Sequence, residues 1–264
     1  MQMLRQSIRL KSAQEIEAMR LPNRLVAQAL VLAQKAVRPG VTTGEIDKIV
    51  ADFFASHNAK PLFLGYPGKV PFPAVCCISV NDEVVHGIPG KRVLKDGDLL
   101  KIDTGCQING WCGDSAVTLP VGKLSSEVQR LHDVSHEALA LAIREAGKQR
   151  KWSQVALRIQ EYVRSEGYSL VEQFVGHGIG RSMHEEPQVP NYVSRSWLRH
   201  DFWLDPGLVI AIEPMVNMGT KKVTVKNDHW TVCTADNLPS CHVEHTVAFT
   251  EKGIEILTSR EGLN

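Results

Sequence analysis

The sequence Asp98-Leu-Leu-Lys-Ile-Asp-Thr-Gly-Cys-Gln-Ile-Asn-Gly-Trp-Cys-Gly-Asp-Ser-Ala-Val-Thr118 predicts a β-hairpin that carries two aspartates on one face. At its centre stands Asn109-Gly110, the strongest two-residue signal for the type I′ turn of a hairpin. This turn sets the register of the two strands, so Asp103 lies opposite Ala116. Asp114 is two residues from Ala116 and therefore on the same face, with its Cβ roughly 7–8 Å from that of Asp103. Both carboxylates can then reach one cation.

The residues around the two aspartates predict that the hairpin is buried on both faces. Leu99 and Ile102 stand on the first strand, and Ala116-Val117 on the second. For a single aspartate, solvent exposure or a turn cap is the more common explanation. A buried carboxylate, however, requires hydrogen bonds, protonation or a metal, because an unpaired charge is costly in an apolar interior. The pair therefore favours a cation site.

Outward from the hairpin, the chain twice follows the order of two helices and then strands. Capping boxes at Ser12 and Thr42 begin the first two helices, and Pro22 is expected to kink or divide the first of them. Strands are expected from Val75 to Leu119 and again from Leu170 onward. The expected helices span about residues 12–38, 42–54, 126–146 and 153–166. Two similar halves without a flexible linker favour an α+β architecture in a single domain, residues 1–264.

The composition excludes several classes of protein. The chain has 264 residues, of which 43% are hydrophobic. Its 30 basic and 29 acidic side chains give a formal net charge of +1. This balance gives no electrostatic footprint for nucleic acid or an anionic membrane. No apolar run approaches the roughly 18 residues of a transmembrane helix. The six cysteines form no Cys-x-x-Cys pair, which argues against a disulfide framework or structural zinc and favours a reduced cytoplasm.

Two histidines and two glutamates stand in segments that are otherwise apolar or rich in glycine. His177 lies in Gly176-His-Gly-Ile-Gly180, and His184 follows seven residues later. Glu213 and Glu244 each interrupt an apolar run, where glutamate is rare unless it is paired. A structural histidine or an edge-exposed glutamate would explain any one of them alone, and the glycines do not match the dinucleotide fingerprint. Together with the two aspartates, they favour a functional cluster.

The charges of the four acids suggest what holds them together. Asp103, Asp114, Glu213 and Glu244 supply four negative charges, which two divalent cations would neutralise. A single cation would leave a large uncompensated charge in a buried site. Two ions about 3.5–4 Å apart are typical of dinuclear hydrolases.

At these residues the sequence resembles the type I methionine aminopeptidases. Their fold is the pita-bread fold of creatinase and the aminopeptidases, with two pseudo-symmetric halves around a curved antiparallel sheet. The resemblance covers about residues 12–258, which leaves residues 1–11 as a short N-terminal extension. The motifs that carry it are Val-His86-Gly-Ile-Pro, Asp103-x10-Asp114, Gly-His177-Gly-Ile-Gly-Arg-x-x-His184-Glu-Glu-Pro, Ile-Glu213-Pro-Met and Glu244-His-Thr.

The resemblance implies a role for each of these residues. The implied ligands of two divalent ions (Co, Mn, Fe or Zn) are Asp103, Asp114, His177, Glu213 and Glu244, with Asp114 and Glu244 bridging both ions. His86 and His184 are implied to contact the substrate and to stabilise the tetrahedral intermediate, and Glu213 is expected to carry a proton to the leaving amine. The methionine pocket is expected to include Tyr66, Phe72, Cys77 and Trp230, because sulfur and aromatic rings suit a thioether.

The implied activity is the removal of N-terminal methionine from nascent proteins and peptides, with a hydroxide bridging the two ions as the nucleophile. Nascent chains are the expected partners, contact with the ribosome stays open, and no nucleic-acid specificity or membrane association is expected. A cytoplasmic monomer is the simplest assembly. Three departures from many relatives stand out: Cys112 replaces a histidine, Met183 replaces a phenylalanine, and the loop from Tyr66 to Cys77 is longer.

Three alternative functions fit the sequence less well. A prolidase or Xaa-Pro aminopeptidase usually carries a further N-terminal domain, whereas about eleven residues precede the first expected helix. A catalytically inactive binding protein of the same fold would lack some of the ligands, and all five are present. A nucleotide-binding protein using Gly176 to Gly180 would need a phosphate-binding lysine, which this motif lacks.

Overall fold

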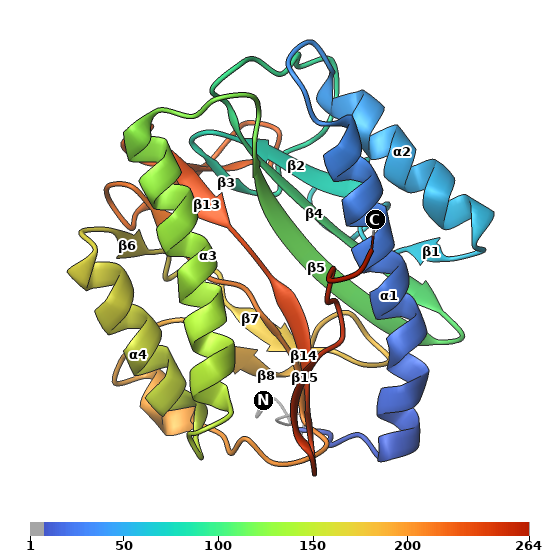
Figure 1. Cartoon of the computed structure of the whole chain (residues 1–264), viewed down its shortest axis with the longest axis vertical. Coiled ribbons are helices and arrows are strands. Elements are labelled where there is room, and N and C mark those ends of the chain that lie inside the picture. Colours follow the sequence, from blue (N-terminus) through green and yellow to red (C-terminus); the bar gives the residue numbers. More distant parts are fainter. Residues whose placement is uncertain (1–7, 264) are drawn as a thin grey trace.

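The computed structural model describes residues 8–263 and places four long helices on the outside of a group of antiparallel sheets (Figure 1). Most of the expected N-terminal extension, residues 1–7, lies outside the described residues, as does residue 264. The helices are α1 (Ala13–Ala36), α2 (Thr43–Ser56), α3 (Ser126–Ala146) and α4 (Trp152–Ser165), with a short 3₁₀ helix η1 at Trp197–His200. The predicted α+β class and all four predicted helices are confirmed.

The first two helices begin where the sequence predicts. Ser12 and Thr42 each accept a hydrogen bond from the backbone of the glutamate three residues on, and both capping boxes are complete. Pro22 lies inside α1, but the helix continues through it without a break, so the expected division does not occur. The carbonyl group of Pro22 accepts a hydrogen bond from the Cys106 thiol, which ties this part of α1 to the neighbouring sheet.

The central hairpin has the predicted register. Strands β4 (Leu99–Ile108) and β5 (Trp111–Pro120) pair in antiparallel fashion, with Asp103 opposite Ala116. The turn residues Asn109 and Gly110 have φ values of 53° and 75°, as a type I′ turn requires. The strand β2 (Cys76–Val80) pairs with the other edge of β4 and brings Cys77 beside Asp103.

Within residues 8–263, backbone hydrogen bonds group the strands into four antiparallel sheets. Strands β1 (Lys60–Pro61), β4 and β2 form one sheet together with β5. The largest sheet has five strands, in the order β15-β14-β9-β7-β8, and contains β9 (Val209–Ile212) and β7 (Gly176–Gly178). The other two sheets have the orders β13-β10-β6 and β11-β12-β3. The remaining strands are β3 (Glu83–Val85), β6 (Ser169–Leu170), β8 (Glu185–Val189), β10 (Met215–Asn217), β11 (Val223–Val225), β12 (Val232–Thr234), β13 (Ser240–His242), β14 (His245–Thr250) and β15 (Gly253–Ile256).

Each half of the chain has a core of its own. In the first half, apolar side chains of α1 and α2 pack on β2 and β4, as Leu30 and Ile102 illustrate. In the second half, α3 and α4 pack on β9 and β14, as Leu131 and Ile210 illustrate. Figure 1 shows the two helix pairs on opposite sides of the molecule, with the strands between them. No helix of the described residues is both long enough and apolar enough to cross a membrane.

Gly113 sets how closely α1 approaches the hairpin. A Cβ atom at this position would lie 2.6 Å from the backbone nitrogen of Asn23, far inside contact distance. The absence of a side chain therefore lets α1 cover one face of β5 directly. Because side chains alternate along a strand, the neighbouring Asp114 points to the opposite face.

Candidate active site

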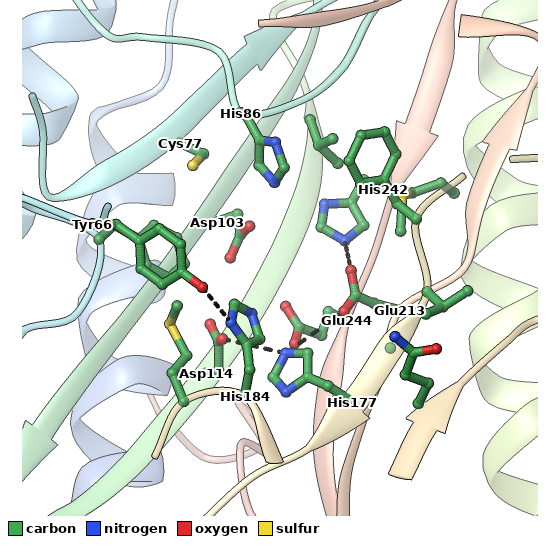
Figure 2. A pocket seen from close by; sticks show the side chains of 18 of the residues that line it. Tyr66, Cys77, His86, Asp103, Asp114, His177, His184, Glu213, His242 and Glu244 are labelled. Carbon is green, nitrogen blue, oxygen red and sulfur yellow. Dashed lines mark hydrogen bonds and ion pairs between the residues drawn. The ribbon is translucent and has the colours of Figure 1, made fainter. Parts of the chain in front are cut away.

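A cavity of about 460 Å³ lies where the two halves of the chain meet, and Figure 2 shows the polar side chains that point into it. The structure brings together every site residue predicted from the sequence. The predicted residues that line this cavity are Tyr66, Phe72, Cys77, His86, Asp103, Asp114, His177, His184, Glu213, Trp230 and Glu244.

Five of these residues line the cavity with carboxylate or imidazole groups that could bind a metal. Asp103 and Asp114 come from the hairpin, His177 from β7, Glu213 directly follows β9, and Glu244 stands between β13 and β14. Ligand atoms of Asp114, His177 and Glu244 all lie within 4.8 Å of one another. His177 Nε2 is 3.8 Å from Asp114 Oδ2 and 3.7 Å from Glu213 Oε1. Segments far apart in the sequence thus converge on one small volume.

The glycines around His177 serve strand packing. A Cβ atom on Gly176 would lie 2.3 Å from the Ala211 carbonyl oxygen, and one on Gly178 would lie 2.2 Å from that of Glu186. Both positions therefore need glycine for β7 to fit between β9 and β8. This packing accounts for the glycine-rich motif without a bound phosphate.

A hydrogen bond fixes how His177 faces the cavity. Its Nδ1 lies 2.9 Å from the Gly178 carbonyl oxygen, which can only accept. In the neutral ring the proton is therefore on Nδ1, and Nε2 presents a lone pair to the carboxylates. This is the usual arrangement of a metal-binding histidine.

Burial makes the carboxylates costly in the protein alone. It raises the pKa of Asp103 to about 7 and raises the pKa values of Asp114 and Glu244 well above their ordinary range, and the mutual repulsion of the carboxylates adds to the shifts of the latter two. Within the described residues, one oxygen of each of these three carboxylates is buried without a hydrogen-bond partner. Such a group of unsatisfied acceptors fits cations, and carboxylates with one imidazole suit Mn, Fe, Co or Zn.

Two further histidines face the same space from the sides. The His184 Nδ1 lies 2.8 Å from the Tyr66 hydroxyl, and the His184 ring meets the His177 ring edge-on with centroids 4.4 Å apart. His86 follows β3 and has a φ of 59°, in the left-handed region. Burial lowers the pKa of His86 and that of His184 to about 4, so both rings are neutral near pH 7.

Aromatic rings and a thiol form an apolar wall beside the polar group. The Trp230 ring lies edge-on to Phe72, with centroids 5.3 Å apart, and edge-on to Tyr66 at 6.4 Å. The Trp230 Nε1 donates to the Val70 carbonyl oxygen at 2.8 Å, which joins the tryptophan to the loop between Tyr66 and Cys77. These positions suit a pocket for an unbranched apolar side chain.

His242 also belongs to the cavity, although it is not among the residues predicted from the sequence. This residue is 2% exposed and lines the cavity, and its Nε2 lies 3.3 Å from Glu213 Oε2. A signal was present, because His242 precedes Glu244 by two residues in an apolar strand-like run. Cys112, in contrast, does not line the cavity. Burial raises the pKa of its thiol to about 11, which disfavours the reactive thiolate form.

Comparisons with known proteins agree with this geometry. The model of metallopeptidase family M24 matches residues 17–251. Methionine aminopeptidase 1 of Bacillus subtilis (strain 168) is 44% identical over 248 residues, which cover 94% of this chain and 98% of that protein. The chain belongs to the methionine aminopeptidases of metallopeptidase family M24. It is thus a hydrolase, and the predicted resemblance is confirmed.

Solved structures of a methionine aminopeptidase and a prolidase confirm the pita-bread fold. The crystal structure of methionine aminopeptidase from Thermotoga maritima superposes with a TM-score of 0.90 at 40% identity, over 96% of this chain and 100% of that one. The prolidase from Pyrococcus furiosus shares the fold at 23% identity, with a TM-score of 0.76, over 96% of this chain and 66% of that one. The M24 family of metallopeptidases also accounts for the need for a metal at the carboxylate cluster.

Proposed function

We propose that this M24 enzyme removes N-terminal methionine from peptides and nascent proteins with the help of two divalent ions. The observation that carries the proposal is the junction, in one cavity, of a five-residue donor group and an aromatic, sulfur-lined pocket. The donor group suits the hydrolysis of a peptide bond, and the pocket suits the methionine side chain. The identity to enzymes named methionine aminopeptidase supports the same substrate.

The ions would be held by Asp103, Asp114, His177, Glu213 and Glu244. Four carboxylates balance two divalent charges, and Asp103, Asp114 and Glu244 each have an oxygen that no protein donor satisfies within the described residues. When bound, such ions would polarise the scissile carbonyl and lower the pKa of the attacking water. The raised pKa values of the acids fit this function, because cations favour the ionised forms that burial alone disfavours.

The protein's own side chains then complete the reaction. Glu213 accepts a proton from the attacking water and passes it to the leaving amine. The Tyr66 hydroxyl lies 2.8 Å from His184 Nδ1, and we assign it as the donor, so that the ring proton is on Nε2 and can bond to the oxygen that gains charge in the transition state. His86 is proposed to donate a hydrogen bond to the same developing charge.

A metal removal and restoration assay with two peptides tests the function. The chelated protein should cleave neither Met-Ala-Ser nor Ala-Pro-Ala, and Mn²⁺, Co²⁺, Fe²⁺ or Zn²⁺ should restore cleavage of Met-Ala-Ser only. Restored cleavage of the proline peptide alone would indicate a prolidase-like enzyme. No metal-dependent cleavage of either peptide would indicate a catalytically inactive relative.

We further propose that the whole chain acts as one catalytic unit, in monomeric form, in the cytoplasm. Support for one unit comes from the cavity, which takes Asp114 from the first half and Glu244 from the second. Six free, buried cysteines support a reducing compartment. Chains emerging from the ribosome are the natural source of the substrate.

A further inference from the structure

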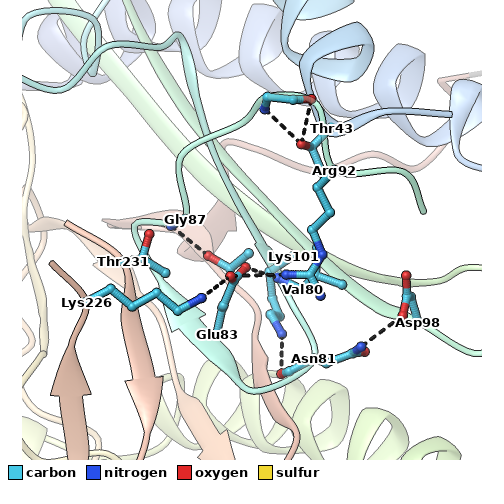
Figure 3. Close-up of polar contacts among 12 residues, drawn as sticks. Thr43, Val80, Asn81, Glu83, Gly87, Arg92, Asp98, Lys101, Lys226 and Thr231 are labelled. Carbon is cyan, nitrogen blue, oxygen red and sulfur yellow. Dashed lines mark hydrogen bonds and ion pairs between the residues drawn. The ribbon is translucent and has the colours of Figure 1, made fainter. Parts of the chain in front are cut away.

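Glu83 is a buried carboxylate outside the cavity that connects segments of both halves of the chain (Figure 3). Its side chain is 10% exposed. Oε2 accepts a hydrogen bond from the Val80 backbone N–H at 2.8 Å. Oε1 accepts one from Lys226 Nζ at 2.7 Å and lies 3.1 Å from a guanidinium nitrogen of Arg92. Both oxygens are thus engaged, one by a neutral donor and the other by two cations.

The bond to Lys226 fixes the turn that presents Trp230. The Lys226 N–H donates to the Thr231 carbonyl oxygen at 2.8 Å, which closes the turn. Inside it, Asp228 accepts hydrogen bonds from the N–H groups of Trp230 and Thr231 at 2.9 and 2.8 Å. Beyond it, β12 pairs with β3, the strand that begins with Glu83. The Glu83–Lys226 contact therefore joins the first residue of this turn to the strand on which the turn rests.

The same strand leads directly to His86. β3 ends at Val85, and the chain then enters the left-handed conformation of His86. The next residue, Gly87, donates to Ser79 Oγ at 3.0 Å, and Arg92 anchors the following loop to Glu83 from the other end. One carboxylate thus holds both the strand before His86 and the loop after it.

The hairpin that carries Glu83 has a firm base. Lys101 is almost fully buried and donates from Nζ to the carbonyl oxygens of Asn81 and Ser240, at 2.7 and 3.0 Å. Asn81 stands in the turn between β2 and β3, and Ser240 begins β13 in the second half. Because hydrogen bonds from the Lys101 ammonium group fix this turn, the position of Glu83 is fixed as well, and Glu83 can orient the segments that contact it.

We propose that Glu83 is a positioning residue for substrate recognition. It positions Trp230 by holding the turn that begins at Lys226, and it positions His86 by holding β3 and the loop that contains Arg92. The inference rests on the proposed removal of N-terminal methionine, because it assigns the pocket wall to that substrate. Lys226 transmits the effect to Trp230 alone, whereas Glu83 transmits it to both residues. A substitution of Lys226 therefore tests the effect on Trp230 alone, whereas a substitution of Glu83 tests the effect on both Trp230 and His86.

Glu83→Gln is a nearly isosteric test. In one orientation the new amide group faces the Val80 N–H, and in the other it faces Lys226 and Arg92, so a donor always meets a donor. Lys226→Met keeps most of the apolar side chain and removes the charged amine that donates to Glu83. Glu145→Gln is the matched control, because Glu145 has a side-chain exposure of 11%, pairs with Lys148 at 2.9 Å and belongs to α3, outside the cavity lining.

The decisive measurement is the ¹⁹F NMR spectrum of the Zn²⁺-loaded protein labelled with 5-fluorotryptophan, with Trp230 assigned through Trp230→Phe. We expect the Trp230 signal to shift or broaden in Glu83→Gln and in Lys226→Met, and to stay in place in Glu145→Gln. For Met-Ala-Ser, Lys226→Met should raise KM about threefold with kcat unchanged, as a half-exposed ion pair allows. Glu83→Gln should lower kcat/KM about tenfold and lower kcat as well.

An unchanged Trp230 signal and unchanged kinetics in Glu83→Gln would overturn the proposal. If that variant does not fold, Lys226→Met decides, because Lys226 is a partly exposed residue whose loss leaves the core intact. If the wild-type protein cleaves no methionine peptide, the proposed function fails, yet the Trp230 signal still reports on Glu83. A shift then supports the positioning role, and its absence rejects it.

Discussion

The carboxylate of Glu213 lies between two imidazoles, with His242 Nε2 3.3 Å from Oε2 and His177 Nε2 3.7 Å from Oε1. The two rings come from different strands, β13 and β7. Each oxygen of the proposed proton carrier therefore has its own neighbour. His177 belongs to the proposed metal ligands, which leaves His242 to fix the orientation of the carboxylate.

This arrangement predicts a specific role for His242. His242→Ala should lower kcat for Met-Ala-Ser by up to about tenfold, because it removes the imidazole whose Nε2 lies 3.3 Å from Glu213 Oε2. His242→Gln should lose less, because its amide keeps a polar group next to the Glu213 carboxylate. Steady-state kinetics with metal analysis of each variant provide the measurement. Equal losses in both variants, or loss of metal from either, would show that His242 does not act by orienting Glu213.

Asp114→Asn should remove metal and activity together. Asp114 is 3% exposed and shares its surroundings with His177 and Glu244, so one substitution affects both proposed ions. Changes in residues that only support metal ligands cost about 10–100-fold, and loss of a proposed ligand itself should cost more than about a hundredfold in kcat/KM. Elemental analysis by mass spectrometry and the peptide assay test this together. Full metal occupancy with normal turnover would refute the ligand assignment.

The contribution of Asp103 to the stability of the metal-free protein should decrease as the pH rises. Burial raises the pKa of Asp103 to about 7, whereas in the unfolded chain it is about 3.9. The folded state therefore holds the proton more tightly. This contribution is complete below about pH 4 and is lost as the pH rises towards 7, with an upper size of roughly 4 kcal/mol.

Asp103→Asn isolates this effect from the other titrating groups. In chelator, the free energy of unfolding of the wild-type protein relative to Asp103→Asn should fall as the pH rises from about 4 to about 7. Urea unfolding at several pH values measures the difference. With saturating Mn²⁺ the trend should disappear or reverse, because the metal binds the ionised carboxylate. A difference that rises with pH in chelator would contradict the assigned burial.

The sequence was sufficient to predict the hairpin because its register depends on local chemistry. Asn109 and Gly110 adopt positive φ at little cost, and the alternation of side chains then determines that Asp103 and Asp114 share a face. Similarly, complete capping boxes at Ser12 and Thr42 place the starts of two helices. Each of these predictions needs only a few neighbouring residues.

The features that sequence reasoning missed depend on contacts between distant segments. His242 meets Glu213 because β13 pairs with β10, which puts His242 opposite Met215, two residues after that glutamate. Nothing local to either residue specifies this pairing. Pro22 likewise stays inside α1, where the packing of the helix on Gly113 and the bond from Cys106 act against the local tendency to break the helix.

His184→Ala distinguishes a transition-state donor from a metal ligand. Burial lowers the pKa of the His184 ring to about 4, so the ring is neutral throughout the neutral range, and with Tyr66 assigned as the donor to Nδ1 it would donate from Nε2. Removing such a donor typically costs about 10²–10³ in kcat. Metal content and the KM of Met-Ala-Ser should change little, because the ring is proposed to act mainly in the transition state.

Tyr66→Phe provides the companion measurement. It leaves the imidazole of His184 in place but removes the hydroxyl that selects its tautomer, so kcat should fall by less than in His184→Ala, by about tenfold. In the double variant the two losses should not add, since Tyr66 acts through His184. Additive losses would show that the two residues act independently. Loss of metal from His184→Ala would instead make this histidine a ligand and reverse the division of roles between His177 and His184.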